Sequence, residues 1–540
     1  MRNRASDSVK SQDLHHGRRL ASMALFVGLT AGLAAMTGCG GSDDPASTAT
    51  SSGSAGLTTP LAFVNNRDDK TMSVIALNGA NNPVITTMPA SNFENNALGD
   101  MITSKEEWIF VNLGVGNKVA TIDPLSGAVP IHEANLPTGE RPVHIYADTT
   151  DKEVIWSMND GNATTGVDNI NCATSGGGSV TILHNSHLGP GGNPPHVEKT
   201  ICLLGAGHKV AAFSQPTATT PGIPKRVFIS STTAGEIAVI DNEPASAQFR
   251  TLIHRIDLCT DAGEAAQTPP QPACDVNANQ SNVLNTPNKS NPHGIRWSQA
   301  AGKVYSIQEG YKTIVEIDPV SYAMTRTLDL AGTPYTAFGI TPDGRFLLLR
   351  GTDLATDSAH IIGRLAVVDV TAGSPLTIIP VAALTDVVPS TFKFAPDGKR
   401  LYMVAANTAT GNGAQAAAQK KDRLFVFDPS GFPAAISPLA EVTLPAATGH
   451  SFDVVVKGAG AASDVVVSNG TVGTPGSVTI INASTNAAGA SISVGLNPGA
   501  VMAYVNGAVS SGNVATAEAV RPSGGEAGLP ERLDDHGMPE

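Results

Sequence analysis

The feature that most constrains the fold is a short pattern that occurs eight times along the chain. Each copy has an apolar residue, two variable positions, a second apolar residue and then a polar end residue. The end residues lie 45–77 positions apart and are Asn78, Asp123, His184, Asp241, Asp318, Asp369, Asp428 and Asn482. A second apolar run, such as WIFVNL or KVYSIQ, precedes each copy. Helical periodicity is nearly absent, so each unit is expected to form about four short antiparallel strands.

Repeats of this length and strand content are typical of a β-propeller, an all-β ring whose blades bury their faces only against neighbouring blades. The first unit lacks an inner strand, and a suitable strand, Gly499–Val505, follows the eighth unit. The sequence therefore predicts an eight-bladed propeller over residues 57–506, in which the C-terminal strand completes the first blade. A seven-bladed ring, with one unit as an insertion, is the alternative. The polar end residues are expected to start turns by accepting hydrogen bonds from the following backbone amides.

The two ends of the chain differ from the repeats. Residues 1–38 have a basic start and an apolar run, Leu20–Ala35, that is too short for a membrane span. The order Met-Thr-Gly-Cys before and at Cys39 resembles a bacterial lipoprotein signal, which implies cleavage before Cys39 and lipidation of its thiol; a plain secretory signal is the alternative. Residues 39–56 and 507–540 are polar and rich in Gly and Ser or in charge, as expected for a flexible tether and a disordered tail. We expect an exported protein, lipid-anchored on the periplasmic side of the outer membrane or at the cell surface.

The charge of the chain excludes one class of partner. The formal net charge is −13, and removal of a leader with five basic and two acidic side chains changes it to −16. No cluster of Lys and Arg remains to neutralise phosphates, so a nucleic acid is not the expected partner. The expected form of the protein is a monomer.

Four further cysteines accompany Cys39. An exported protein with four cysteines is expected to form two disulfides. We favour the local pairs Cys172–Cys202 and Cys259–Cys274, because each closes a loop rich in Gly, Pro, Asn or Gln. A soft metal site built from the thiols is the alternative, although no Cys-x-x-Cys spacing occurs.

Four histidines lie at or just before expected inner strands, which all run in the same direction and begin at one mouth of the central channel. They are His144, His208, His293 and His450, in blades three, four, five and eight. Neutral imidazoles from separate blades suit zinc or another transition metal. The alternative is that each imidazole simply bonds a backbone carbonyl at a strand end. Carboxylates that would serve as a fourth ligand or orient an imidazole are Asp100, Glu140, Asp148 and Asp453. Turns or outer strands are expected to hold His132, His184, His187, His196, His254 and His360.

Three segments resemble a known family. The stretch from Thr138 to His144, the GAGHKVAAFS stretch around His208, and Gly449–His450 are similar to the corresponding parts of the β-propeller periplasmic zinc metallochaperones. The blade pattern as a whole also resembles the broader YVTN-type repeat propellers. The metallochaperone resemblance implies zinc binding in the channel and delivery to a periplasmic metal-binding or transport protein. The His- and Asp-rich mobile segment of that family is absent here, where the matching region retains only His132.

Three function classes remain. The first is an exported propeller that binds zinc, or copper, for storage or delivery. The second is a scaffold whose faces bind a protein or glycan, and the third is a lactonase or a metal- or haem-dependent oxidoreductase that uses the channel. The sequence offers an enzyme little support, because it has no Cys-x-x-Cys-His haem attachment and no Gly-x-Ser-x-Gly nucleophile elbow.

Overall fold

The structure is a computed structural model of the 540-residue chain. It describes residues 60–77, 82–104, 108–124, 129–149, 151, 153–162, 172, 177–185, 194–203, 205–275, 287–457 and 461–505. The chain divides into Met1–Gly53, which lies wholly outside these residues, and Ser54–Glu540, which contains every element below. The expected leader, tether and tail, together with Cys39 and His187, therefore lie outside the described residues.

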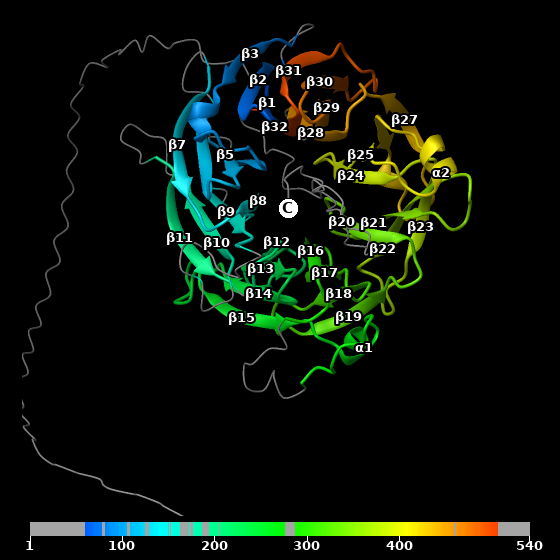
Figure 1. Cartoon of the computed structure of the whole chain (residues 1–540). Coiled ribbons are helices and arrows are strands. Elements are labelled where there is room, and N and C mark those ends of the chain that lie inside the picture. Colours follow the sequence, from blue (N-terminus) through cyan, green and yellow to red (C-terminus); the bar gives the residue numbers. More distant parts are fainter. Residues whose placement is uncertain are drawn as a thin grey trace, which may run out of the picture. The chain divides into compact units, whose positions relative to one another are not determined.

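The described chain forms eight four-stranded antiparallel sheets around a central axis, which are the blades of a propeller (Figure 1). In every blade the innermost strand lies nearest the axis. These inner strands, in blade order, are β32 (Pro498–Tyr504), β4 (Met101–Ser104), β8 (Pro142–Ala147), β12 (Lys209–Ser214), β16 (Pro292–Ser298), β20 (Tyr335–Ile340), β24 (Pro389–Phe394) and β28 (Gly449–Lys457).

The remaining strands follow in the same blade order. The second strands are β1 (Leu61–Asn66), β5 (Trp108–Leu113), β9 (Val154–Asn159), β13 (Arg226–Ser231), β17 (Lys303–Gln308), β21 (Phe346–Asp353), β25 (Leu401–Ala405) and β29 (Ala461–Gly470). The third strands are β2 (Thr71–Ala76), β6 (Lys118–Asp123), β10 (Ser179–His184), β14 (Glu236–Asp241), β18 (Thr313–Ile317), β22 (Ile362–Asp369), β26 (Arg423–Phe427) and β30 (Pro475–Asn482). The outer strands are β3 (Val84–Met88), β7 (Ile131–Pro137), β11 (His196–Cys202), β15 (Leu252–Asp257), β19 (Met324–Asp329), β23 (Ile379–Thr385), β27 (Pro438–Thr443) and β31 (Ile492–Leu496).

The ring closes through strand β32, as the sequence predicts. This last strand pairs antiparallel with β1, with Leu61 opposite Tyr504 and Phe63 opposite Met502. The Phe63 and Tyr504 rings pack edge to face with centroids 6.4 Å apart. The eight-bladed prediction is therefore confirmed, and the seven-bladed alternative is wrong. Closure also gives the inner edge of β1 a hydrogen-bonded partner.

The core lies between the blades. Strands β1, β5 and β9 are buried along their whole length, whereas the outer strand β7 is mostly half-exposed. One apolar cluster joins Tyr305 of blade five, Phe338 of blade six and Phe392 of blade seven. Since each sheet faces a neighbour on both sides, a blade gains its burial only from the ring.

The turns after the third strands have the chemistry expected of them. The Asp318 carboxylate accepts hydrogen bonds from the amides of Val320 and Ser321, at 2.9 and 2.8 Å. Asn482 accepts in the same way from the amides of Ser484 and Thr485, both at 3.0 Å. These contacts confirm the turn-starting role predicted for Asp318 and Asn482.

Helices are few and short. Those in the described residues are the 3₁₀ helices η1 (Ala90–Phe93) and η4 (Pro429–Gly431) and the α-helices α1 (Asp261–Ala265) and α2 (Gly413–Ala418). In the part of the chain that the structure describes, no helix has the length and apolar character needed to cross a membrane. The cysteines form the two disulfides that the sequence favours, Cys172–Cys202 and Cys259–Cys274. The thiol metal site considered as the alternative is therefore wrong.

Candidate metal centre

Three of the four predicted histidines meet where the inner strands begin. The Nε2 atoms of His144 and His208 lie 2.7 Å apart. The ring centroid of His208 lies 4.4 Å from that of His144 and 4.8 Å from that of His293. We call His144, His208 and His293 the histidine cluster; its members come from the successive blades three, four and five.

Local irregularities in the backbone place these side chains. The β8–β9 register shifts between Pro142 and His144, and the β16–β17 register shifts between Pro292 and Gly294, on either side of His293. A bulge of this kind re-aims a side chain that a regular strand would turn elsewhere. His208 instead precedes β12 and follows Gly207, whose φ of 110° is unfavourable for a residue with a Cβ.

Each imidazole of the cluster has a carboxylate beside its other nitrogen. His144 Nδ1 is 2.8 Å from Asp100 Oδ2, and His293 Nδ1 is 2.6 Å from Glu309 Oε1. His208 Nδ1 is 3.5 Å from Asp160 Oδ2. The contact with Asp100 favours a proton on His144 Nδ1, so the lone pair of His144 Nε2 is directed at His208 Nε2.

Burial controls the protonation of the central imidazole. Burial and the neighbouring His144 lower the pKa of His208, so its ring is neutral at neutral pH. Burial alone would raise the pKa of Asp160, but the contact with His208 and the positive charge of Lys209 lower it below its ordinary value. A neutral imidazole beside an ionised carboxylate is the state in which histidine ligates a metal.

The fourth predicted histidine, His450, makes a different set of contacts. Its Nε2 lies 3.0 Å from Asp422 Oδ1, and its Nδ1 lies 3.0 Å from Asn469 Oδ1. Both ring nitrogens are thus engaged by blades seven and eight, and the side chain is fully buried. The structure brings together His144, His208 and His293 but does not join His450 to them.

The other expected carboxylates and histidines are placed elsewhere. Asp148 accepts hydrogen bonds from Trp156 Nε1 and Asn242 Nδ2, at 3.0 and 2.7 Å, and Asp453 lies 3.2 Å from Lys393 Nζ. Of the four carboxylates considered from the sequence, Asp100 contacts the cluster directly. Outer or third strands contain His132, His184, His196 and His254, and His360 lies before β22.

Sequence reasoning missed Asp160 and Glu309. Each is the first residue after the second strand of its blade, following Asn159 in β9 and Gln308 in β17. Second strands end at the mouth where inner strands begin, because paired strands are antiparallel. An acidic residue at that position was therefore a usable signal.

The metal-binding geometry is incomplete as the side chains stand. Among the residues that the structure describes, no group of three or more His, Cys, Asp or Glu side chains has the arrangement needed to hold a metal ion. The two facing Nε2 atoms are 2.7 Å apart, whereas two nitrogens on one tetrahedral zinc are separated by about 3.3 Å. The difference of about 0.6 Å is within reach of small side-chain rotations.

Fold and site together define an eight-bladed β-propeller with a histidine cluster at one mouth of its channel. No family model matches the chain, and no curated protein is similar to it. Apo AztD from Citrobacter koseri, a solved structure, is 15% identical with a TM-score of 0.46, over 85% of this chain and 100% of that chain. A putative 6-phosphogluconolactonase from Bacteroides fragilis is 13% identical with a TM-score of 0.41, over 71% of this chain and 95% of that chain. These scores are too low to transfer an activity to this chain.

Proposed function

We propose that this protein is an exported propeller that binds a zinc or copper ion at the histidine cluster, for storage or for delivery to a second protein. The observation that carries the proposal is the 2.7 Å separation of His144 Nε2 and His208 Nε2. With its Nδ1 proton directed at Asp100, His144 presents the lone pair of Nε2 to His208 Nε2. Such a close approach is repulsive unless a proton or a metal ion lies between the two nitrogens.

The donor set fits a borderline transition metal. Three imidazole nitrogens suit zinc and copper, and three protein ligands leave one position for water or for a ligand of an acceptor protein. The carboxylates of Asp100, Asp160 and Glu309 offset the charge of a bound cation. An ion held by ligands from three blades has no single loop to release it, so transfer requires an acceptor that competes for the open position.

The cellular setting belongs to the same proposal. Two disulfides favour an oxidising compartment such as the periplasm. Anchoring through Cys39 and a periplasmic metal-binding or transport protein as the acceptor complete the proposed function.

The test is a metal titration of purified, metal-stripped protein. Zinc and copper affinities are measured by competition with a chromophoric chelator for wild type, His144→Ala, His208→Ala and His293→Ala. His450→Ala is the matched control, since it removes a buried imidazole at the start of an inner strand with both nitrogens engaged elsewhere. We expect one ion per chain, with affinity reduced at least a hundredfold in each cluster variant and unchanged in the control.

Two results would refute the proposal. The first is a wild-type protein that stays metal-free at micromolar zinc and copper, which would favour the scaffold function. The second is equal loss of affinity in His450→Ala, because that would place the ion outside the histidine cluster.

A further inference from the structure

Both disulfides lie on the face of the propeller that contains the histidine cluster. Cys172 lies in the connection from the second to the third strand of blade three, and Cys202 is the last residue of β11. Cys259 and Cys274 lie in the connection from blade four to blade five. All of these cysteines lie at the mouth where inner strands begin. The β9–β10 connection starts at Asp160, the chain after Cys202 reaches His208, and the β15–β16 connection ends just before His293.

The Cys172–Cys202 disulfide joins the two segments that hold the His208–Asp160 pair. Asp160 begins the segment that reaches Cys172, and the segment that starts at Cys202 reaches His208 six residues later. The amide of Gly207 donates to Asp160 O at 2.7 Å and joins the two segments directly, while the amide of Leu203 donates to Gly178 O, just before β10, at 3.1 Å.

The opposite side of the His208 segment rests on blade four. The amide of Thr232 donates to His208 O at 3.1 Å. A Cβ added at Gly207 would lie 2.5 Å from Thr233 Cγ2, so the segment is closely packed there. The Cys172–Cys202 disulfide and the Gly207–Asp160 hydrogen bond thus attach the His208 segment to blade three, while Thr232 attaches it to blade four.

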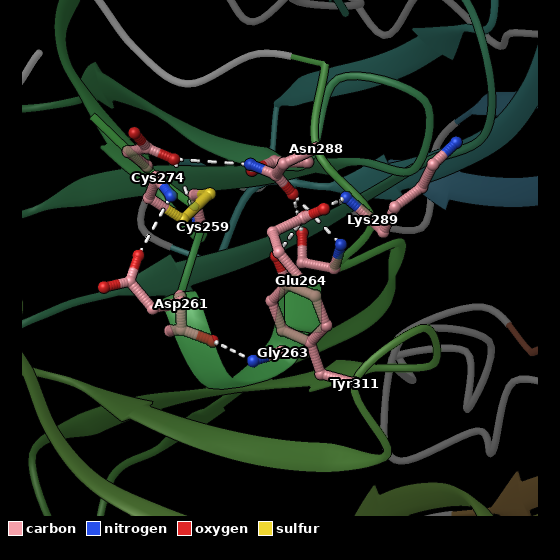
Figure 2. The surroundings of a disulfide bond; sticks show 12 residues. Cys259, Asp261, Gly263, Glu264, Cys274, Asn288, Lys289 and Tyr311 are labelled. Carbon is pink, nitrogen blue, oxygen red and sulfur yellow. Dashed lines mark hydrogen bonds between the residues drawn. A yellow bond between two sulfur atoms is a disulfide. The ribbon is translucent and has the colours of Figure 1, made fainter. Parts of the chain in front are cut away.

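The Cys259–Cys274 disulfide supports the His293–Glu309 pair in the same way (Figure 2). It closes the segment that contains α1, and the Cys274 amide donates to Asp261 Oδ1 at 2.9 Å. The buried Glu264 carboxylate of α1 then accepts from the Lys289 amide at 2.7 Å and from the Tyr311 hydroxyl at 2.6 Å.

Lys289 lies just before strand β16, which contains His293, and Tyr311 lies two residues after Glu309, which follows strand β17. The Gly310 amide donates to Ser290 O at 3.0 Å, and the Glu309 amide donates to Asn291 O at 3.1 Å. Glu264 therefore contacts both of the chain segments that these two backbone hydrogen bonds join, and the segments contain or adjoin His293 and Glu309.

We propose that the two disulfides are positioning elements of the metal centre: Cys172–Cys202 holds His208 against Asp160, and Cys259–Cys274 holds His293 against Glu309. The inference rests on the proposed function and adds a dependence of metal affinity on the thiol redox state. A dithiol reductant supplies two electrons and two protons to each disulfide, gives two thiols, and is itself oxidised to a disulfide. The reduced protein keeps its propeller but loses the fixed orientation of two of its three imidazoles.

The test compares C172S/C202S and C259S/C274S with the full-length wild-type protein. Zinc affinity is measured by chelator competition, and the imidazole nitrogen shifts of the metal-free proteins are measured by NMR after selective ¹⁵N-histidine labelling. We expect zinc affinity to fall at least tenfold in each double variant. The tautomer signal of His208 should change in the first variant and that of His293 in the second.

Leu348→Ala is the stability control, since Leu348 is fully buried in blade six and contacts neither segment. It should retain wild-type zinc affinity and wild-type imidazole signals. Glu264→Gln keeps the disulfide and should reproduce the change at His293, which covers the case in which C259S/C274S does not fold. For Cys172–Cys202 the same role falls to brief reduction of native, metal-free wild type with dithiothreitol, after which the tautomer signal of His208 should change.

Unchanged affinity and unchanged signals in the disulfide variants would overturn the inference, as would an equal loss of affinity in Leu348→Ala. A wild-type protein that binds no zinc would refute the proposed function instead. In that case the imidazole signals of the metal-free proteins still decide whether the disulfides orient His208 and His293.

Discussion

Ring closure by β32 offers the sharpest test of how this fold is held together. A chain that ends at Asn497 lacks the strand, and β1 then has an unpaired inner edge. The strand contributes Val501, Met502 and Tyr504 to the cores on both sides of blade one, and all three are buried. The truncation therefore removes burial as well as hydrogen bonds.

The expected magnitude follows from these three side chains. Burying a large apolar side chain contributes about 1.5–3 kcal/mol, so the strand contributes roughly 5–9 kcal/mol. A whole domain is stable by only about 5–15 kcal/mol. We therefore expect the truncated chain to form no stable ring. Tyr504→Ala alone should cost about 3–5 kcal/mol, which lowers the melting temperature by about 5 °C for the roughly 400 residues that the structure describes.

Calorimetry and circular dichroism of the exported proteins measure both effects. Leu439→Ala is the control, because Leu439 is 52% exposed on the outer strand β27. It should melt within about 1 °C of wild type, since exposed substitutions change stability by less than about 0.5 kcal/mol. A truncated chain that melts cooperatively at the wild-type temperature would show that the ring does not depend on its last strand.

Three further predictions concern charge, hydrogen bonding and metal. Burial raises the pKa of Glu236 to about 7, so the folded chain keeps a proton that the unfolded chain loses above about pH 4.5, and stability falls as the pH rises between these values. Glu236→Gln should match wild type in urea unfolding at pH 4 and be more stable by about 3 kcal/mol at pH 8; equal stability at both pH values would contradict the buried-carboxyl explanation. Tyr305→Phe removes a buried hydroxyl that donates to Glu316 Oε2 at 2.6 Å, and should lower the free energy of unfolding by about 2 kcal/mol in the same assay; a change below about 0.5 kcal/mol would mean that Arg326 and Thr325 satisfy Glu316 without it. Zinc at 100 times its dissociation constant should stabilise wild type by about 2.7 kcal/mol, or about 3 °C, and EDTA should reverse the shift; a zinc-induced shift that survives in His208→Ala would point to another site.

The repeat pattern was sufficient to predict the blades. Apart from Asn78, which lies outside the described residues, each polar end residue lies at or directly after the end of the third strand of its blade. A first strand missing at one end of the chain and a spare strand at the other, ending at Tyr504, predict a closed ring. Because the pattern is repeated in every blade, the fold can be predicted even where single positions depart from it.

The histidine cluster was only partly predictable, because its geometry depends on departures from the period. Register shifts in β8 and β16 direct the side chains of His144 and His293. The residue types at these positions do not predict such shifts. His450 has the same kind of position, yet Asp422 and Asn469 occupy both of its ring nitrogens. Contacts with the preceding blade and with the adjacent strand decide this case, and the residue types of a single sequence do not reveal them.

The pairing of Leu61 with Tyr504 has a practical consequence for where the chain enters and leaves the ring. These two residues lie opposite each other at the far ends of β1 and β32, at the mouth away from the one where inner strands begin. Affinity tags, surface-immobilisation handles or fused partners joined just before Leu61 or just after Tyr504 are therefore attached on the side remote from His144, His208 and His293. A biosensor or pull-down experiment built this way presents the imidazoles to the dissolved acceptor rather than to the support.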